Sequence, residues 1–249
     1  MTTENLVIRM LRPFGLKVQP IEVCTEKTPD LLVSDGTCNY LIEIKDKFPD
    51  PSTEQQRAQV LDAGEVWTEE QGLGYENAIS KVIREGAAQL ASFQKGPIDF
   101  RLLWLHSRHR YESQLRQFEA TLYGAVDLLD LAEAPLARPC FFFTYSEFFR
   151  LREVLDGAFV ASDNRGILCL NSFSPRFEKL KSSQLCQAFR GICDPVDLER
   201  TGKAYVADCN VSRKNRTAVL EYVKAKYARP QLIPFEPKRH SAQMAVPRS

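Results

Sequence analysis

The sequence predicts an α/β protein in which a mixed sheet is flanked by helices. Two observations lead to this expectation. Apolar residues recur at steps of three and four in several segments, as they do on the buried side of a helix. Between these segments lie short apolar runs bounded by glycine, proline or aspartate, which is typical of strands. Over the first 106 of the 249 residues, the predicted order of elements is αβββαβ.

The opening helix is predicted over residues 3–12, where Leu6 and Met10 fall on one side, and Pro13 and Gly15 end it. Three strands are predicted next, over residues 16–23, 31–34 and 39–46, with a turn at Asp35-Gly36. A second helix is predicted over residues 76–93, because its apolar residues from Ile79 to Phe93 share one face. An apolar strand over 100–105 suits the interior of a sheet.

Three regions lie outside this core of residues 1–106. Residues 47–74 are interpreted as a loop insertion with one helix near 54–61. Residues 107–229 continue in α/β style, and form either an extension of the same body or a companion domain. Residues 230–249 are expected to be an extended, basic, proline-rich tail. Within 107–229, helices are predicted from 111 to Gly124 and over 147–155, 176–189 and 211–227, and strands over 125–131, 139–145 and 167–173.

The composition is that of an ordinary soluble globular protein, with 44% hydrophobic and 26% charged residues. No apolar run approaches the roughly 18 residues needed to span a bilayer, and the first residues lack a basic segment followed by an apolar one. The seven cysteines form no CxxC pair and are expected to be reduced thiols. A cytoplasmic protein without a membrane partner is therefore predicted.

Charge is distributed unevenly, although the net charge is only +1. Residues 1–100 carry 10 basic and 16 acidic side chains, whereas residues 201–249 carry 10 basic and 3 acidic ones. A local basic field can hold a polyanion even where the total charge is near zero. Arg213, Lys214 and Arg216 are the first candidates for contacts with a nucleic-acid backbone. The alternative is a solvated basic helix and tail.

The most informative pattern is Pro29-Asp30 at the start of one predicted strand, followed by Glu43-Ile44-Lys45 inside the next. A hairpin between them would bring Asp30 near Glu43 and Lys45 at one end of the sheet. Side chains alternate across a strand, so Glu43 and Lys45 share a face. Hard cations such as Mg²⁺ take carboxylate and carbonyl oxygens. We therefore expect Asp30, Glu43 and the Ile44 carbonyl to hold Mg²⁺ or Mn²⁺ beside Lys45.

This pattern and the αβββαβ order resemble the PD-(D/E)xK nuclease superfamily, whose members mostly cut phosphodiester bonds. The resemblance covers about 100 residues, from the first helix to the strand at Phe100. It implies a restriction-endonuclease-like core with Asp30, Glu43 and Lys45 as catalytic residues. A second E-x-K triplet, Glu236-Pro237-Lys238, has no strand around it and shows that a bare triplet also arises by chance.

The same resemblance suggests two accessory residues. Many members recruit an acidic residue from the opening helix, where Glu4 is the only one here; a solvated glutamate is the alternative. Gln89 resembles the glutamine of a Q-x-x-x-Y element of some exonuclease branches, with Phe93 in place of tyrosine; a glutamine on the helix surface is the alternative. His106 and His109 are expected in a solvated turn, with phosphate contact as the alternative. The run Phe141-Phe142-Phe143 is expected in the core.

The leading hypothesis is a Mg²⁺-dependent nuclease of the endonuclease type that hydrolyses DNA, with Lys45 positioning the attacking water. DNA is the expected partner, RNA stays open, and a homodimer or larger complex is left open. The alternative is a catalytically silent nucleic-acid-binding or scaffold subunit with a nuclease-like fold. A small-molecule enzyme is disfavoured because GxGxxG, GxxxxGK[ST] and GxSxG motifs are absent.

Overall fold

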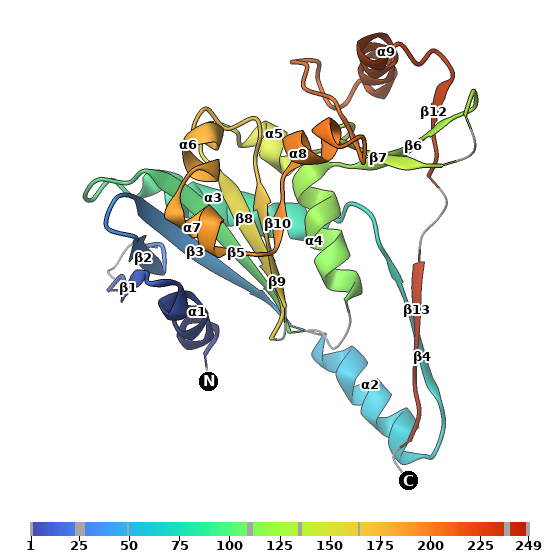
Figure 1. Cartoon of the computed structure of the whole chain (residues 1–249). Helices are drawn as coiled ribbons and strands as arrows, with labels where there is room; N and C mark the ends of the chain where they lie inside the picture. The colour runs from blue at the N-terminus through green and yellow to red at the C-terminus, as the bar shows by residue number, and fades with distance from the viewer. Residues whose placement is uncertain are drawn as a thin grey trace.

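The structure is a computed structural model that describes residues 2–22, 28–48, 50–108, 112–133, 136–163, 165–236 and 240–247 (Figure 1). Seven strands form its main sheet: β1 (Lys17–Pro20), β2 (Leu31–Ser34), β3 (Asn39–Lys47), β5 (Phe100–Ser107), β8 (Gly157–Ala161), β9 (Gly166–Leu170) and β10 (Ile192–Cys193). Their order in the sheet is β1-β2-β3-β5-β8-β9-β10. The sheet is mixed, because β3, β5 and β8 are parallel while the β1–β2, β2–β3 and β8–β9 pairs are antiparallel.

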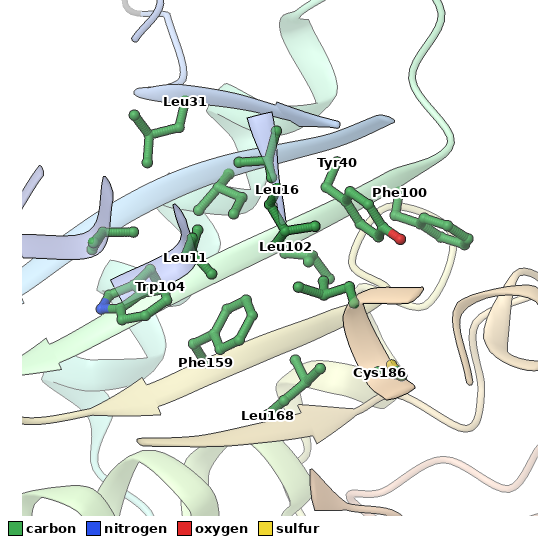
Figure 2. Packing of buried hydrophobic residues seen from close by; sticks show 14 of the residues in the cluster. Leu11, Leu16, Leu31, Tyr40, Phe100, Leu102, Trp104, Phe159, Leu168 and Cys186 are labelled. Atoms are coloured by element: carbon green, nitrogen blue, oxygen red, sulfur yellow. The ribbon is translucent and has the colours of Figure 1, made fainter. Parts of the chain in front are cut away.

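Helices cover both faces of this sheet, which confirms the predicted α/β class. On one face, α1 (Thr3–Leu11), α6 (Phe177–Lys181) and α7 (Gln184–Ala188) pack on Tyr40, Ile42 and Trp104. Figure 2 shows Tyr40 and Trp104 within this cluster. On the other face, α3 (Asn77–Ser92) and α4 (Ser113–Tyr123) pack on Leu41, Leu103 and Leu105. Each large apolar side chain fully buried in this way contributes about 1.5–3 kcal/mol. The alternation of Tyr40, Leu41 and Ile42 between the faces fixes the direction of the β3 side chains further along the strand.

A second sheet contains four strands: β6 (Val126–Asp130), β7 (Arg138–Phe141), β11 (Tyr205–Val206) and β12 (Leu232–Pro234). Its order is β11-β7-β6-β12, and α9 (Arg216–Tyr227) packs on it through Val219 and Val223. A two-stranded ribbon joins β4 (Trp67–Gly72) to β13 (His240–Ala245), and α2 (Pro51–Asp62) lies beside it (Figure 1). The remaining short helices are η1 (Arg12–Phe14), α5 (Glu147–Arg150) and α8 (Pro195–Arg200).

The strand pairing shows how the regions outside residues 1–106 are organised. Residues 107–229 provide both β8–β10 of the main sheet and most of the second sheet, which agrees with the expected extension of the same body. The regions 47–74 and 230–249 are not a loop and an extended tail, because β4 and β13 pair with each other along six residues. The backbone hydrogen bonds between β4 and β13, which are distant in the sequence, satisfy the polar groups of both segments and stabilise them as strands.

Several predicted elements have different bounds in the structure. The strand predicted over 139–145 ends at Phe141, because Phe142 has a φ of 60° and turns the chain. The helix predicted over 176–189 is two short helices, α6 and α7. The strand predicted over 16–23 is β1, which ends at Pro20, and Val23 lies outside the described residues. Tyr111, the first residue of the helix predicted up to Gly124, also lies outside them. No helix within the described ranges combines the length and the apolar character that crossing a bilayer requires.

Candidate active site

Asp30 stands opposite Glu43 where β2 begins. The register pairs Leu31 with Ile42, so the next position outward places Asp30 across from Glu43 and on the same face. The backbone of Asp30 is fixed from both sides, since its N–H donates to the Ile42 carbonyl at 3.2 Å and its carbonyl accepts the Ile21 N–H at 2.8 Å. The hairpin predicted from the sequence therefore brings the two carboxylates together.

Next to the first residue of β2, the Asp30 side chain, and not a backbone carbonyl, accepts a hydrogen bond from β3. Its Oδ2 accepts the backbone N–H of Ile44 at 2.7 Å. In an extended strand the N–H and C=O of one residue face the same neighbour, so the carbonyl of Ile44 lies on the side of Asp30. Ile44 can thus add a main-chain oxygen to the two carboxylates.

Glu43 is buried, with 2% of the residue exposed, and it has one paired and one unpaired oxygen. Oε1 lies 2.7 Å from the Lys45 Nζ, whereas the buried Oε2 has no hydrogen-bond partner among the described residues. Burial raises the pKa of Glu43 to about 7; Lys45 lowers it, and the nearby charge of Asp30 raises it further. A buried carboxylate oxygen without a partner is costly, and a bound cation would satisfy it.

Helix α3 covers this group and supplies Gln89. The Lys45 ammonium donates to Gln89 Oε1 at 2.5 Å as well as to Glu43. Gly86, one turn earlier, allows the helix to come this close: a Cβ there would lie 2.6 Å from Leu103 Cδ2 and 3.2 Å from Lys45 Cε. Gly86 was not predicted from the sequence as part of the site. Its signal is a glycine inside a long amphipathic helix, which costs about 1 kcal/mol relative to alanine.

The donor set of Asp30, Glu43 and the Ile44 carbonyl fits Mg²⁺ or Mn²⁺. Mg²⁺ is commonly held by one or two carboxylates, with water and substrate phosphate completing its shell. The unpaired Glu43 Oε2 is an oxygen that such an ion would use. No group of three or more histidine, cysteine, aspartate and glutamate residues in the described ranges is suited to hold a metal ion, so a closed site made only of side chains is not present there.

The structure does not place Glu4 in the group formed by Asp30, Glu43, Lys45 and Gln89. It lies in α1, which packs on the face of the sheet opposite α3. The neighbouring Thr3 hydroxyl donates to Asp46 at 2.5 Å and accepts from Arg108 at 2.5 Å. The side chains of Asp30, Glu43, Lys45 and Gln89 therefore meet without a contribution from α1.

The three basic candidates differ in their surroundings, and Arg213 is buried, so it is not available to contact a nucleic-acid backbone. Only 5% of Arg213 is exposed, and its guanidinium donates to the carbonyls of Ala207 and Cys209 at 2.7 and 2.8 Å while lying 3.8 Å from the ring centroid of Phe149. The helix starts at Arg216, not at 211. Arg216 pairs with Glu236, and Lys214 is exposed. Pro237 and Lys238 of the second E-x-K triplet lie outside the described residues.

Two further predictions concern the phenylalanines at 141–143 and His106; the structure confirms the first and contradicts the second. The phenylalanines at 141–143 are buried, as predicted. His106 is not in a solvated turn: it is a fully buried residue of β5, with Nε2 3.0 Å from Asp163 Oδ1. The position of His109 is outside the described residues.

No protein-family model, curated protein or solved structure matches this chain. The residues and their geometry therefore carry the functional argument alone.

Proposed function

We propose that this chain is a Mg²⁺-dependent endonuclease that hydrolyses phosphodiester bonds of DNA. The observation that carries the proposal is the convergence of Asp30, Glu43 and Lys45 on one face of the sheet, with a buried oxygen of Glu43 left without a partner. Two carboxylates and an ammonium around such an oxygen suit a divalent cation and a phosphate.

The arrangement of elements supports a restriction-endonuclease-like core of the PD-(D/E)xK type. In chain order the elements are α1, β1, β2, β3, α3 and β5, with the inserted α2 and β4 between β3 and α3. The antiparallel strands β1–β3 are followed by β5 parallel to β3, and α1 and α3 lie on opposite faces. Without the insertion, this is the αβββαβ order that the sequence predicts for the core.

In this proposal each residue has a defined task. Asp30, Glu43 and the Ile44 carbonyl hold the cation, which offsets charge on the phosphate and makes water more acidic. Lys45 has three N–H donors, and Glu43 and Gln89 engage two of them. The third is left to orient the attacking water or a phosphate oxygen. Gln89 is a positioning residue, since it acts through Lys45.

DNA is the proposed substrate because the basic C-terminal region can hold a polyanion. Lys214 is exposed there, and Arg216 is half-buried with an ion pair to Glu236; Arg213 is excluded from this role by its burial. RNA stays an alternative substrate, and a homodimer is a further expectation that cutting of both strands would suit.

The test is cleavage of supercoiled plasmid, linear duplex, single-stranded DNA and RNA, each with Mg²⁺, Mn²⁺ or EDTA. Lys45→Ala and Asp30→Asn should each slow metal-dependent cutting about 100-fold or more, as loss of a transition-state contact does. Lys81→Ala is the matched control, because its side chain on α3 is 76% exposed. Nicking of the circular plasmid distinguishes an endonuclease from an exonuclease.

The alternative of a silent subunit gives a different result. In that case folded wild-type protein binds nucleic acid, with affinity that falls as salt rises, but cuts none of the four substrates with either metal. Equal cutting by the wild type and Lys45→Ala would instead contradict the assignment of the site.

A further inference from the structure

A pair of cysteines lies side by side in the main sheet, away from the candidate active site. Cys169 of β9 and Cys193 of β10 are register partners in parallel strands, so their side chains point to the same face. Neighbouring strands are about 4.8 Å apart, which falls in the range of about 4.4–6.8 Å that Cα atoms of disulfides span. The backbone therefore already places the two thiols at a distance a disulfide can bridge.

The two thiols differ in access. Cys169 is fully buried, with 0% exposed. Cys193 is partly exposed and lines a cavity of about 720 Å³ between α4 and the second sheet, together with Tyr123, Glu119 and Phe235. Cys193 lines this cavity and its register partner Cys169 does not, so a small reagent in the cavity reaches Cys193 before Cys169.

The surroundings make Cys193 the more reactive of the two. The neighbouring Cys169 thiol lowers the pKa of Cys193, and Tyr123 adds to this effect, whereas burial and the charges of Glu119 and Asp194 oppose it. The pKa of Cys169 is raised by its neighbour Cys193 and by burial. The Tyr123 hydroxyl also lies 3.1 Å from the Leu170 carbonyl and 3.0 Å from the Cys193 carbonyl, which holds both strands in register. Thiolates, not thiols, are the nucleophiles.

We propose that Cys193 is an oxidisable thiol that reacts with hydrogen peroxide in this cavity, and that Cys169 resolves it into a Cys169–Cys193 disulfide. The Cys193 thiolate attacks one peroxide oxygen and the O–O bond breaks, giving a sulfenic acid and a hydroxide that takes up a proton to become water. The Cys169 sulfur then attacks the Cys193 sulfur, the S–O bond breaks, and a second water leaves. Two thiols and one peroxide thus give one disulfide and two waters. A reactive thiol next to a resolving cysteine is the usual arrangement of oxidisable pairs.

The remaining described cysteines provide internal controls. Cys38, Cys140 and Cys186 are buried, and burial raises the pKa of Cys186 to about 11. Cys209 is partly exposed like Cys193, but its sulfur accepts a hydrogen bond from Arg213 at 3.6 Å. A reaction confined to Cys193 among these residues would reflect its own site, not general exposure.

The first experiment needs no variant. The folded chain is pulsed with a thiol alkylating reagent at neutral pH, before and after treatment with hydrogen peroxide, and digested without reduction for mass spectrometry. Cys193 should be alkylated at least about tenfold faster than Cys140 and Cys186, in keeping with its thiolate character. Peroxide should abolish this labelling and yield a Cys169–Cys193 cross-linked peptide, and dithiothreitol should restore the labelling.

The variants Cys169→Ser and Cys193→Ser then separate the two roles. Without Cys169, peroxide should carry Cys193 to the sulfinic acid, which dithiothreitol does not reverse. Without Cys193, Cys169 should stay unmodified. Slow labelling of wild-type Cys193, or a peroxide-induced cross-link that joins other cysteines, would overturn the proposal.

Discussion

At the scale of single residues, Glu43 affects stability in a way that depends on pH. Its folded pKa of about 7 lies above the ordinary glutamate value of 4.5, chiefly because the carboxyl is buried. Between these two values the folded state holds a proton that the unfolded state has lost. Stability therefore falls as pH rises through this window, by up to about 3 kcal/mol for a shift of this size.

We predict that Glu43→Gln removes this dependence. In EDTA, the unfolding free energy of the wild type should fall by about 2–3 kcal/mol more than that of the variant between pH 4.5 and 8. Glutamine keeps the shape of the side chain and does not ionise, so the difference between the two curves isolates Glu43. Urea unfolding at four pH values measures it.

The exposed Glu178 on α6 is the control position, and Glu178→Gln should follow the wild-type curve. At pH 8, Mg²⁺ should stabilise the wild type more than Glu43→Gln, since a ligand that binds the folded state stabilises it. Parallel pH curves for the wild type and Glu43→Gln would show that Glu43 titrates normally.

At the scale of elements, the distance between α3 and β3 determines where Gln89 and Lys45 meet. Gly86 sits at the contact, and α3 has no other glycine. In a solvated helix, alanine would be favoured over glycine by about 1 kcal/mol. Here the added Cβ would lie 2.6 Å from Leu103 Cδ2 of β5 and 3.2 Å from Lys45 Cε of β3, too close for van der Waals contact, so the helix or these side chains have to shift.

We predict that Gly86→Ala destabilises the protein by about 1–3 kcal/mol, as overpacking of a core does. The same shift should separate Gln89 from Lys45 and reduce cleavage more than it reduces DNA binding. Urea unfolding, cleavage rates and binding isotherms test the two effects separately. The neighbouring Glu85→Ala, on the exposed side of the helix, should leave both unchanged.

Elements whose signal is local were predictable from the sequence. Strands β2 and β3 contain alternating or consecutive apolar residues and are bounded by clear turn residues. The apolar residues of α3 recur with the period of a helix, and Glu76 caps its N-terminus. Strand β8 (Gly157–Ala161) was not predicted. All five of its residues are buried, so they show no alternation, and its place between β5 and β9 depends on strands far away in the sequence.

The same distinction applies to the functional residues. Asp30, Glu43 and Lys45 are linked by one hairpin, so their spacing alone predicts that they meet. Arg213 appeared to be a surface cation because its burial depends on Phe149 and Phe173, which come from elements more than 35 residues away. Local charge patterns contain no information about such partners.

At the scale of the whole molecule, α2, β4 and β13 form an arm that extends from the body (Figure 1). None of their described residues belongs to the three hydrophobic clusters of the core. Residues 50–70 carry six acidic side chains and one basic one, so α2 and β4 bring a local excess of negative charge to the arm. A hydrogen bond from the Gln117 side chain to the Gly72 carbonyl at 2.5 Å connects β4 to α4.

We predict that the stability of the body depends little on this arm. A chain that stops after Glu236 loses β13 but keeps β12 and the Arg216–Glu236 pair. Its Tm should lie within about 3 °C of the full chain, which corresponds to roughly 1 kcal/mol for a protein of this size. An isolated strand is not stable without its partner, so β4 should be cut after Glu69 and Glu70 by a glutamate-specific protease much faster than in the full chain.

A chain that stops after Arg229 is the matched control, because it also removes Leu232, which is fully buried in the core of the second sheet. Loss of that side chain and of the β6–β12 ladder should lower the Tm by well over 5 °C, since burial of one leucine alone contributes about 2 kcal/mol or more. If stopping after Glu236 lowered the Tm as much as stopping after Arg229, the arm would be an integral part of the folded body. Unchanged proteolysis at Glu69 and Glu70 would show that β4 keeps its structure without β13.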